Sequence, residues 1–328
     1  MKTPVADGRG ITSQRRLQRA RLQQAGIWPA LLVLLGIAFV VEPLFFGAGN
    51  LSNVLTRAAV LGIVTIGQVL VLMMAGIDLS VGAMIGITAV ALAEAGAGRY
   101  SLTQALIGLV LIAILVGLVN GLLVTKRRVP PVVATFGMFV TLEGARLAYT
   151  RGSASGMIPD AILTVGRATV FGVPAPVLAW VALTVALSIG LHRSVLGRRF
   201  LLTGSNAAMA SLSGISVSRV KIGAYIASAL LAMIAGIFFA GDIGYVDRFI
   251  GRGMDLDSIA AALLGGATFA GGTGSFVHAA GGALLIIVLM NLILLSGLNV
   301  ELQFVAKGLV LIAAVALQAR ATSTDKEH

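Results

Sequence analysis

The chain has 328 residues, of which 58% are hydrophobic and 11% are charged, and its formal net charge is +11. Soluble globular domains are about 25% charged, so this composition excludes an ordinary soluble protein and indicates an integral membrane protein. The long apolar stretches are continuous rather than alternating, which excludes a β-barrel. There is no cysteine and the three histidines are widely spaced, so the sequence offers no disulfide framework and no metal-ligand spacing.

The first residues of the chain are polar and rich in arginine. Residues 1–26 predict a basic cytoplasmic tail that rests on membrane lipid, and residues 320–328 predict a second cytoplasmic tail. Between them, residues 27–319 predict a transmembrane domain. Ten stretches approach the length of about 20 residues that crosses the hydrocarbon core, which indicates an all-α polytopic membrane protein. They are 27–47, 58–76, 79–98, 101–125, 131–150, 173–192, 219–241, 257–270, 275–297 and 302–319, of which 257–270 is too short to cross unaided.

Lys and Arg residues gather in every second connection. They are dense in the tail, at 126–128 and in the long loop 192–221, whereas acidic residues lean towards the other connections. Cytoplasmic loops carry the excess of Lys and Arg, so both ends of the chain are expected in the cytoplasm. Because the basic residues lie in short clusters between apolar stretches, the net charge does not indicate a nucleic-acid partner.

Asp78 interrupts a long apolar region and is the only charged residue between 58 and 93. We expect Gly76 to end one helix, and Asp78 or Ser80 to cap the next on the cytoplasmic side by accepting backbone N–H bonds. The alternative interpretation is that the broken helix end lines a solute path, as broken helices do in transporters.

A second segment repeats this pattern, because GIDLS at 76–80 and GMDLD at 253–257 both read Gly, apolar, Asp, Leu, polar. The predicted topology places the two motifs on opposite sides of the membrane, which is typical of an inverted internal repeat. Chance similarity is the alternative. The candidate helix-break residues are Gly76, Asp78, Ser80, Gly82, Gly253, Asp255, Asp257, Gly271 and Gly272.

The long basic loop contains a short, nearly uncharged segment at 205–214. It begins with Ser205 and Asn206, either of which suits an N-cap, and it ends with Gly214, a natural helix stop. The small apolar side chains between them would be unusual in water, so we predict a helix that docks a partner protein. A helix resting on lipid is the alternative. The residues assigned to docking are Ser205, Asn206, Ala207, Ala210, Leu212 and Gly214.

Catalytic motifs are missing from the sequence, which has no P-loop, no nucleophile–base arrangement and no HExxH. We therefore predict no enzyme activity and no cofactor in this chain. Glu143 and Arg146 have the spacing of an ion pair within one span. Neutral polar side chains near aromatic rings suit a neutral, hydroxyl-rich solute, although each also suits a helix–helix hydrogen bond. The candidates for path lining are Gln68, Asn120, Thr135, Phe136 and Asn291.

Four segments together resemble one known family. In chain order they are GQVLVLMMAGIDLSVGAMIG, NGLLVTKRRVPPVVATFGMF with YTRG, GRRFLLTGSNAAMASLSGISVSRVK and LDSIAAALLGGATFAGGTGS. From about residue 50 to residue 317 the chain is similar to the membrane permease subunits of ribose-type ATP-binding-cassette sugar importers. The resemblance implies a fold like that of the vitamin B12 importer's permease, with ten helices, an inverted repeat and alternating access. It also implies that the family's coupling helix, which contacts the ATPase, lies at 205–214.

The resemblance further implies partners and a location. Two permease subunits, identical or different, would form one path for a monosaccharide or similar polyol. Two cytoplasmic ATP-binding subunits would hydrolyse ATP, and a periplasmic or lipid-anchored protein would deliver the sugar, at the inner membrane of a bacterium. Two alternatives stay open. One is an ion-coupled secondary carrier, which needs buried titratable pairs, and the other is a permease of the same type for branched-chain amino acids or another small solute.

Overall fold

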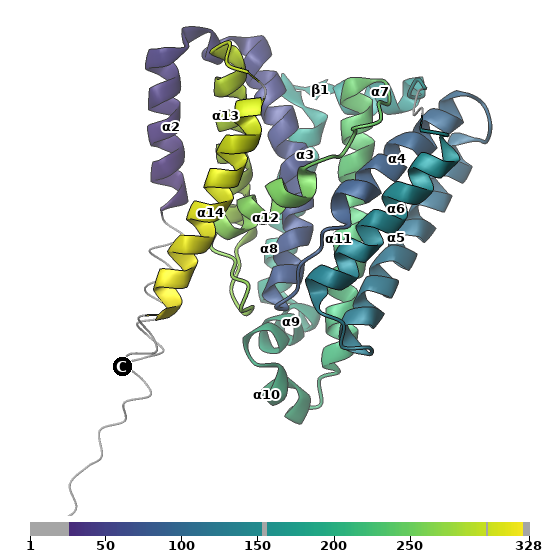
Figure 1. Cartoon of the computed structure of the whole chain (residues 1–328), viewed down its shortest axis with the longest axis vertical. Coiled ribbons are helices and arrows are strands. Elements are labelled where there is room, and N and C mark those ends of the chain that lie inside the picture. Colours follow the sequence, from purple (N-terminus) through teal and green to yellow (C-terminus); the bar gives the residue numbers. More distant parts are fainter. Residues whose placement is uncertain (1–25, 153–155, 300, 324–328) are drawn as a thin grey trace, which may run out of the picture.

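The computed structural model describes residues 26–152, 156–299 and 301–323 (Figure 1). Almost all of the predicted N-terminal tail and most of the predicted C-terminal tail therefore lie outside the described residues. The described chain is all-helical apart from one short hairpin. Its α-helices are α2 (Ile27–Val41), α3 (Ala48–Met73), α4 (Val81–Gly96), α5 (Leu102–Thr125), α6 (Pro131–Tyr149), α7 (Asp160–Arg167), α8 (Ala175–Arg193), α9 (Val195–Ser205), α10 (Ala207–Leu212), α11 (Val217–Ile243), α12 (Met254–Leu264), α13 (Phe276–Leu295) and α14 (Glu301–Ser323).

Each of the ten predicted stretches contains one α-helix. Within the described chain, six of these helices are long and apolar enough to cross a membrane, namely α3, α5, α6, α8, α11 and α13. Helices α2 and α4 are apolar but shorter. Helix α12 has only 11 residues, in line with the short stretch at 257–270. The chain is thus an all-α, multi-pass membrane protein.

The end of α2 and the start of α3 differ from the predicted boundaries for identifiable reasons. Helix α2 stops at Val41 because Glu42 precedes a proline, and the residue before proline is driven out of the helical conformation. A 3₁₀-helix, η1 (Pro43–Phe46), follows it. Helix α3 begins at Ala48 rather than at 58, because the polar Asn50 in its first turn is satisfied. Its amide donates to the Phe45 carbonyl at 2.8 Å and exchanges hydrogen bonds of 2.9 Å with Asn291.

The two ends of the bundle carry different additions, and neither α7 nor α9 was predicted from the sequence. Helices α9 and α10 lie at one end, called here the α9 end, and α7 lies at the opposite end, called the α7 end (Figure 1). The hydroxyl of Ser194 caps α9 by accepting from the Gly197 N–H at 2.9 Å. At the α7 end, a hairpin of β1 (Thr169–Val170) and β2 (Val173–Pro174) pairs Thr169 with Pro174.

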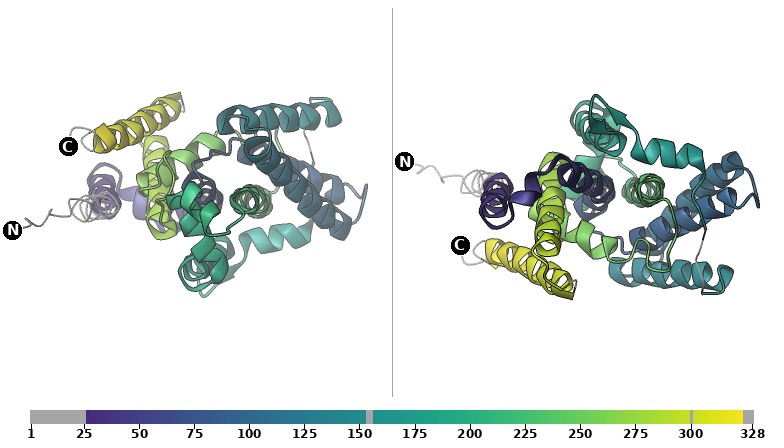
Figure 2. Two further views of the ribbon diagram at one scale, coloured as in Figure 1. Left: turned by 90° about the horizontal axis from the view of Figure 1, so that it is seen from below. Right: turned by 90° about the horizontal axis from the view of Figure 1, so that it is seen from above.

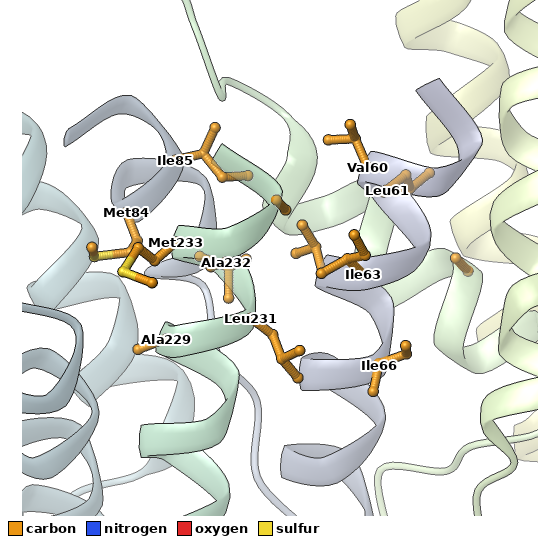
Figure 3. Close-up of a cluster of buried hydrophobic side chains, with 14 of the residues drawn as sticks. Val60, Leu61, Ile63, Ile66, Met84, Ile85, Ala229, Leu231, Ala232 and Met233 are labelled. Carbon is orange, nitrogen blue, oxygen red and sulfur yellow. The ribbon is translucent and has the colours of Figure 1, made fainter. Parts of the chain in front are cut away.

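The core lies between α3, α4 and α11. Ile63 of α3 points towards α11, which carries Leu231 and Ala232, and Met84 of α4 lies on the other side of α11 (Figure 3). Of the six long apolar helices, α3 is the most enclosed, since 89% of its apolar 18-residue stretch is buried.

Small residues let the helices approach closely, as in other membrane bundles. A Cβ added to Gly117 of α5 would lie 2.4 Å from the Ile226 Cα of α11, and one added to Gly121 would lie 2.7 Å from the Ile222 Cα. Helices α2 and α14 lie on one side of the molecule and α5 and α6 on the other (Figure 2). Their outward faces are apolar and suit contact with lipid or a partner, as shown by exposed Leu115, Leu111, Phe304 and Ile312.

Candidate functional site

The first helix break joins α3 to α4 and is held by Asp78. This carboxylate is completely buried, and its Oδ1 accepts from the Ser80 N–H at 3.0 Å and from the Ser80 hydroxyl at 2.6 Å. Ser80 is the N-cap residue of α4, although its own side chain caps no helical N–H. Asp78 therefore satisfies the backbone at the start of α4, as one of the two interpretations predicted.

The end of α3 differs slightly from the expected one. The helix ends at Met73, and Ala75 rather than Gly76 takes the left-handed conformation, with φ of 56°. Gly76 is required for another reason, since a Cβ there would lie 2.5 Å from the hydroxyl of Tyr225.

Three predicted path residues surround this break, and all three are completely buried. The Asn120 amide donates to the Ser80 hydroxyl at 3.0 Å, and the Thr135 hydroxyl donates to the Ile77 carbonyl at 3.2 Å. The Gln68 amide, in the orientation that satisfies both its ends, donates to the Asp78 carbonyl at 3.0 Å and accepts from the Asp78 N–H at 3.3 Å. In this conformation these side chains fix the break, and path lining stays a prediction for them.

The other two predicted path residues lie elsewhere. Asn291 pairs with Asn50 and holds α13 against the start of α3. Phe136 is 54% exposed on α6 and stacks with Phe139 at a centroid distance of 6.1 Å. Of the five, Phe136 is therefore exposed, Asn291 is partly buried and the other three are buried, and path lining stays a prediction for all of them.

The second helix break joins α11 to α12. The connecting segment turns at three glycines with positive φ, Gly244, Gly251 and Gly253, and Gly253 starts α12 without a side-chain cap. Asp257 in the first turn of α12 accepts from the Lys307 ammonium of α14 at 2.6 Å. This ion pair ties α12 to α14.

The glycines after α12 pack against the end of α3. The Gly272 N–H donates to the Met73 carbonyl at 2.9 Å, and both Gly271 and Gly272 have positive φ. A Cβ on Gly204 of α9 would lie 2.6 Å from the same carbonyl. The first break and the loop that follows α12 therefore both lie at the α9 end of the bundle.

The two breaks meet inside the bundle. A Cβ on Gly82 would lie 2.9 Å from the Gly251 carbonyl oxygen and 3.6 Å from the Asp255 nitrogen. The segment 74–80 enters the bundle from the α9 end. The segment 244–253 enters it from the α7 end, where Gly241 of α11 packs on Gly166 of α7. The two motifs therefore lie close together in the fold although their segments enter from opposite ends, and the sides of the membrane to which they belong stay a prediction.

The meeting point opens into two adjoining depressions that share Phe139 and Arg252. The polar depression, of about 290 Å³, is lined by Gly82, Phe139, Glu143, Arg248, Phe249 and Arg252, among others. The apolar depression, of about 320 Å³, is lined mainly by Leu256, Ile286, Met290, Phe304 and Leu311, with the Asp257–Lys307 pair and Asp255 at its wall. The N-terminal ends of α4 and α12, which carry partial positive charge, both reach this surface.

The sequence interpretation missed the basic groups that line the two depressions. Glu143 and Arg146 were recognised as a pair, but Arg248, Arg252 and Lys307 were not assigned to a site. Lys307 carried a usable signal, because a lysine inside a predicted span is a functional candidate by default. In the described part of the chain, no cluster of three His, Asp or Glu side chains is placed to hold a metal ion.

The docking segment forms helix α10 with Asn206 as its N-cap, whose Oδ1 accepts from the Met209 N–H at 3.0 Å. Ser205 is instead the last residue of α9, so the alternative that Ser205 is the cap is wrong. Gly214, with φ of 77°, follows the helix as expected.

The exposed surface of α10 is smaller than predicted. Leu212 is 84% exposed and Met209 59% exposed, and Ala207 is also exposed, whereas Ala210 is buried against the chain itself. Ala210 therefore cannot offer its side chain to a partner.

Comparison with known proteins identifies the family. Residues 50–315 match the model of the family described as branched-chain amino acid transport system / permease component. The ribose import permease of Escherichia coli (strain K12) is 34% identical over 93% of this chain and 96% of its own length. The autoinducer 2 import system permease of Enterobacter sp. (strain 638) is 31% identical over 91% of this chain and 87% of its own length. A probable ABC transporter permease of Sinorhizobium fredii is 35% identical over 93% of this chain and 92% of its own length.

A search of solved structures gave no match. The family match covers most of the chain, and these relatives align along nearly its whole length. The chain therefore belongs to the family of permease subunits of ATP-binding-cassette importers.

Proposed function

We propose that this chain forms half of the translocation path of a bacterial importer for a monosaccharide or similar polyol. The observation that carries the proposal is the meeting of two short helices, α4 and α12: the first turn of α4 borders the polar depression, and that of α12 borders the adjoining apolar one. Broken helices whose N-terminal ends converge inside the membrane form solute sites in transporters. A second permease subunit would complete the path.

The ten-span topology and the vitamin-B12-importer-like fold belong to this proposal. In it, α4 and α12 each cross part of the membrane and their extended entries cross the rest, in opposite directions. This arrangement is what an inverted repeat requires. The α9 end is placed in the cytoplasm, because the basic residues at 126–128 and 198–199 lie at or next to that end.

Partners follow from the family. The energy for transport would come from two ATP-binding subunits that dock on α10, since a chain without a P-loop has no such ATP site of its own. A soluble or lipid-anchored binding protein would deliver the solute at the α7 end. The membrane would be the inner membrane of a bacterium.

Sugar is favoured as the solute because curated relatives that cover nearly the whole chain are named as ribose and autoinducer 2 import permeases. A branched-chain amino acid is the second candidate, since the family description names that solute. An ion-coupled secondary carrier is disfavoured by membership of an ABC-importer family.

The test is uptake by cells of the source bacterium from which this gene has been deleted and then restored. We expect restoration to recover uptake of radiolabelled ribose or another monosaccharide, and to leave leucine uptake unchanged. Recovery of leucine uptake without any sugar uptake would establish the second candidate instead.

A further inference from the structure

The polar depression contains a carboxylate whose orientation is fixed from behind. Arg146 is almost completely buried, and its guanidinium donates to both oxygens of Glu143, with Nε at 3.0 Å from Oε2. The same guanidinium donates to the Arg248 carbonyl at 2.9 Å, which anchors it to the segment before α12. The Glu143 side chain keeps 32% of its surface exposed and lines the depression. A carboxylate held in this way presents its outer lone pairs as acceptors in a fixed direction.

Two arginines that line the same depression supply donors. Arg248 and Arg252 both line the depression, and their guanidinium groups lie 5.5 and 5.6 Å from the centre of the Phe249 ring. Within the described residues, neither guanidinium forms an ion pair with a carboxylate. Gly82 and Ala83, in the first turn of α4, complete the wall with the positive end of a helix.

Acceptors and donors that line one depression suit a group that both donates and accepts, and a hydroxyl is such a group. A phosphate or carboxylate would satisfy the arginines but would be repelled by Glu143, and an ammonium would be repelled by Arg248 and Arg252. The ring of Phe139, which also lines the depression, offers an apolar surface for the C–H groups of a sugar.

We propose that the polar depression is a sugar subsite, in which Glu143 accepts from hydroxyl groups of the sugar and Arg252 donates to them. Arg146 is a positioning residue that acts through Glu143. The proposal rests on the proposed function and adds the class of solute contacts to it.

The test compares Glu143→Gln and Arg252→Gln with Glu94→Gln as a matched control. Glu94 is also a glutamate paired with an arginine, Arg99 at 2.9 Å, but it does not line either depression. Each variant replaces the native gene in the source bacterium, its amount in the membrane is measured, and uptake of labelled ribose and 2-deoxyribose is followed.

At equal abundance, we expect both depression variants to take up ribose about tenfold or more slowly than the native chain, because a hydrogen bond to a charged group is lost. The preference for ribose over 2-deoxyribose should also shrink in Glu143→Gln, and Glu94→Gln should match the native chain. Arg252→Gln provides a second variant on an exposed segment, should Glu143→Gln fail to accumulate.

The outcomes separate the two proposals. Native uptake of sugar together with unchanged rates in Glu143→Gln and Arg252→Gln would overturn the subsite and leave the proposed function intact. Equal slowing of Glu94→Gln would also overturn it, since the effect would then not depend on the depression. Absence of any sugar uptake in the native chain would overturn the proposed function first, and the subsite with it.

Discussion

Replacing Gly117 by alanine should separate α5 from α11 and destabilise the protein. The added Cβ would lie 2.4 Å from the Ile226 Cα and 2.6 Å from the Tyr225 carbonyl oxygen, both backbone atoms that no rotamer change can move. Carbon atoms pack at about 3.5–4.0 Å, so the helices must move apart by about 1 Å. Such overpacking costs about 1–3 kcal/mol. The movement would also stretch the 3.0 Å hydrogen bond from Asn120, one turn away, and thereby lose about 1 kcal/mol more.

Alanine recovers up to about 1 kcal/mol of helix propensity, so the net loss is about 1–3 kcal/mol. Gly108 on the same helix is a matched control, because a Cβ there meets nothing within 4 Å. In detergent, the temperature at which the monodisperse peak is lost should fall for Gly117→Ala and should hold or rise for Gly108→Ala. Equal midpoints for the two variants would refute the close α5–α11 contact as a source of stability.

Three further predictions concern the break, the docking helix and the topology. Asp78→Asn should keep most of the transport activity because its side-chain oxygen still accepts from Ser80, whereas Asp78→Leu should lose about 2–4 kcal/mol by leaving buried donors unpaired; normal abundance and uptake in Asp78→Leu would contradict this. Leu212→Asp should leave the permease at normal levels but reduce ATPase co-purification and uptake several-fold, because Leu212 is exposed, and Ala210→Glu should lower abundance instead, because Ala210 is buried. The chain has no native cysteine, so single cysteines can report the topology. A membrane-impermeant maleimide should label Phe171→Cys, at a fully exposed hairpin tip, in spheroplasts with an intact inner membrane, and should label Leu212→Cys only after permeabilisation. The reverse labelling pattern would invert the topology.

Hydropathy alone located ten of the described helices, because lipid requires long apolar segments and each of the ten stretches holds one. It could not locate their ends where protein contacts replace lipid. The amide of Asn50 is bonded to Phe45 and Asn291, so α3 extends into a region whose polarity suggested a loop. Likewise Ser205 and Asn206 suited the N-cap of α10 equally well, and the continuation of α9 through Ser205 decided between them.

The site was harder to predict for a physical reason. A polar side chain inside a span must find a partner, but the sequence does not say whether that partner is a solute or an interrupted backbone. Gln68, Asn120 and Thr135 were assigned to a path, and here they satisfy groups near Asp78.

The groups that border the depressions come from segments far apart in the chain, α4, α6, 244–253, α12, α13 and α14. Their convergence depends on two extended segments that enter the bundle from opposite ends and meet where Gly82 contacts Gly251. A Cβ on either glycine would press on the other's carbonyl oxygen, so the two short helices start side by side only because both positions lack a side chain. The sequence displayed both glycines, but only the fold shows that they face each other.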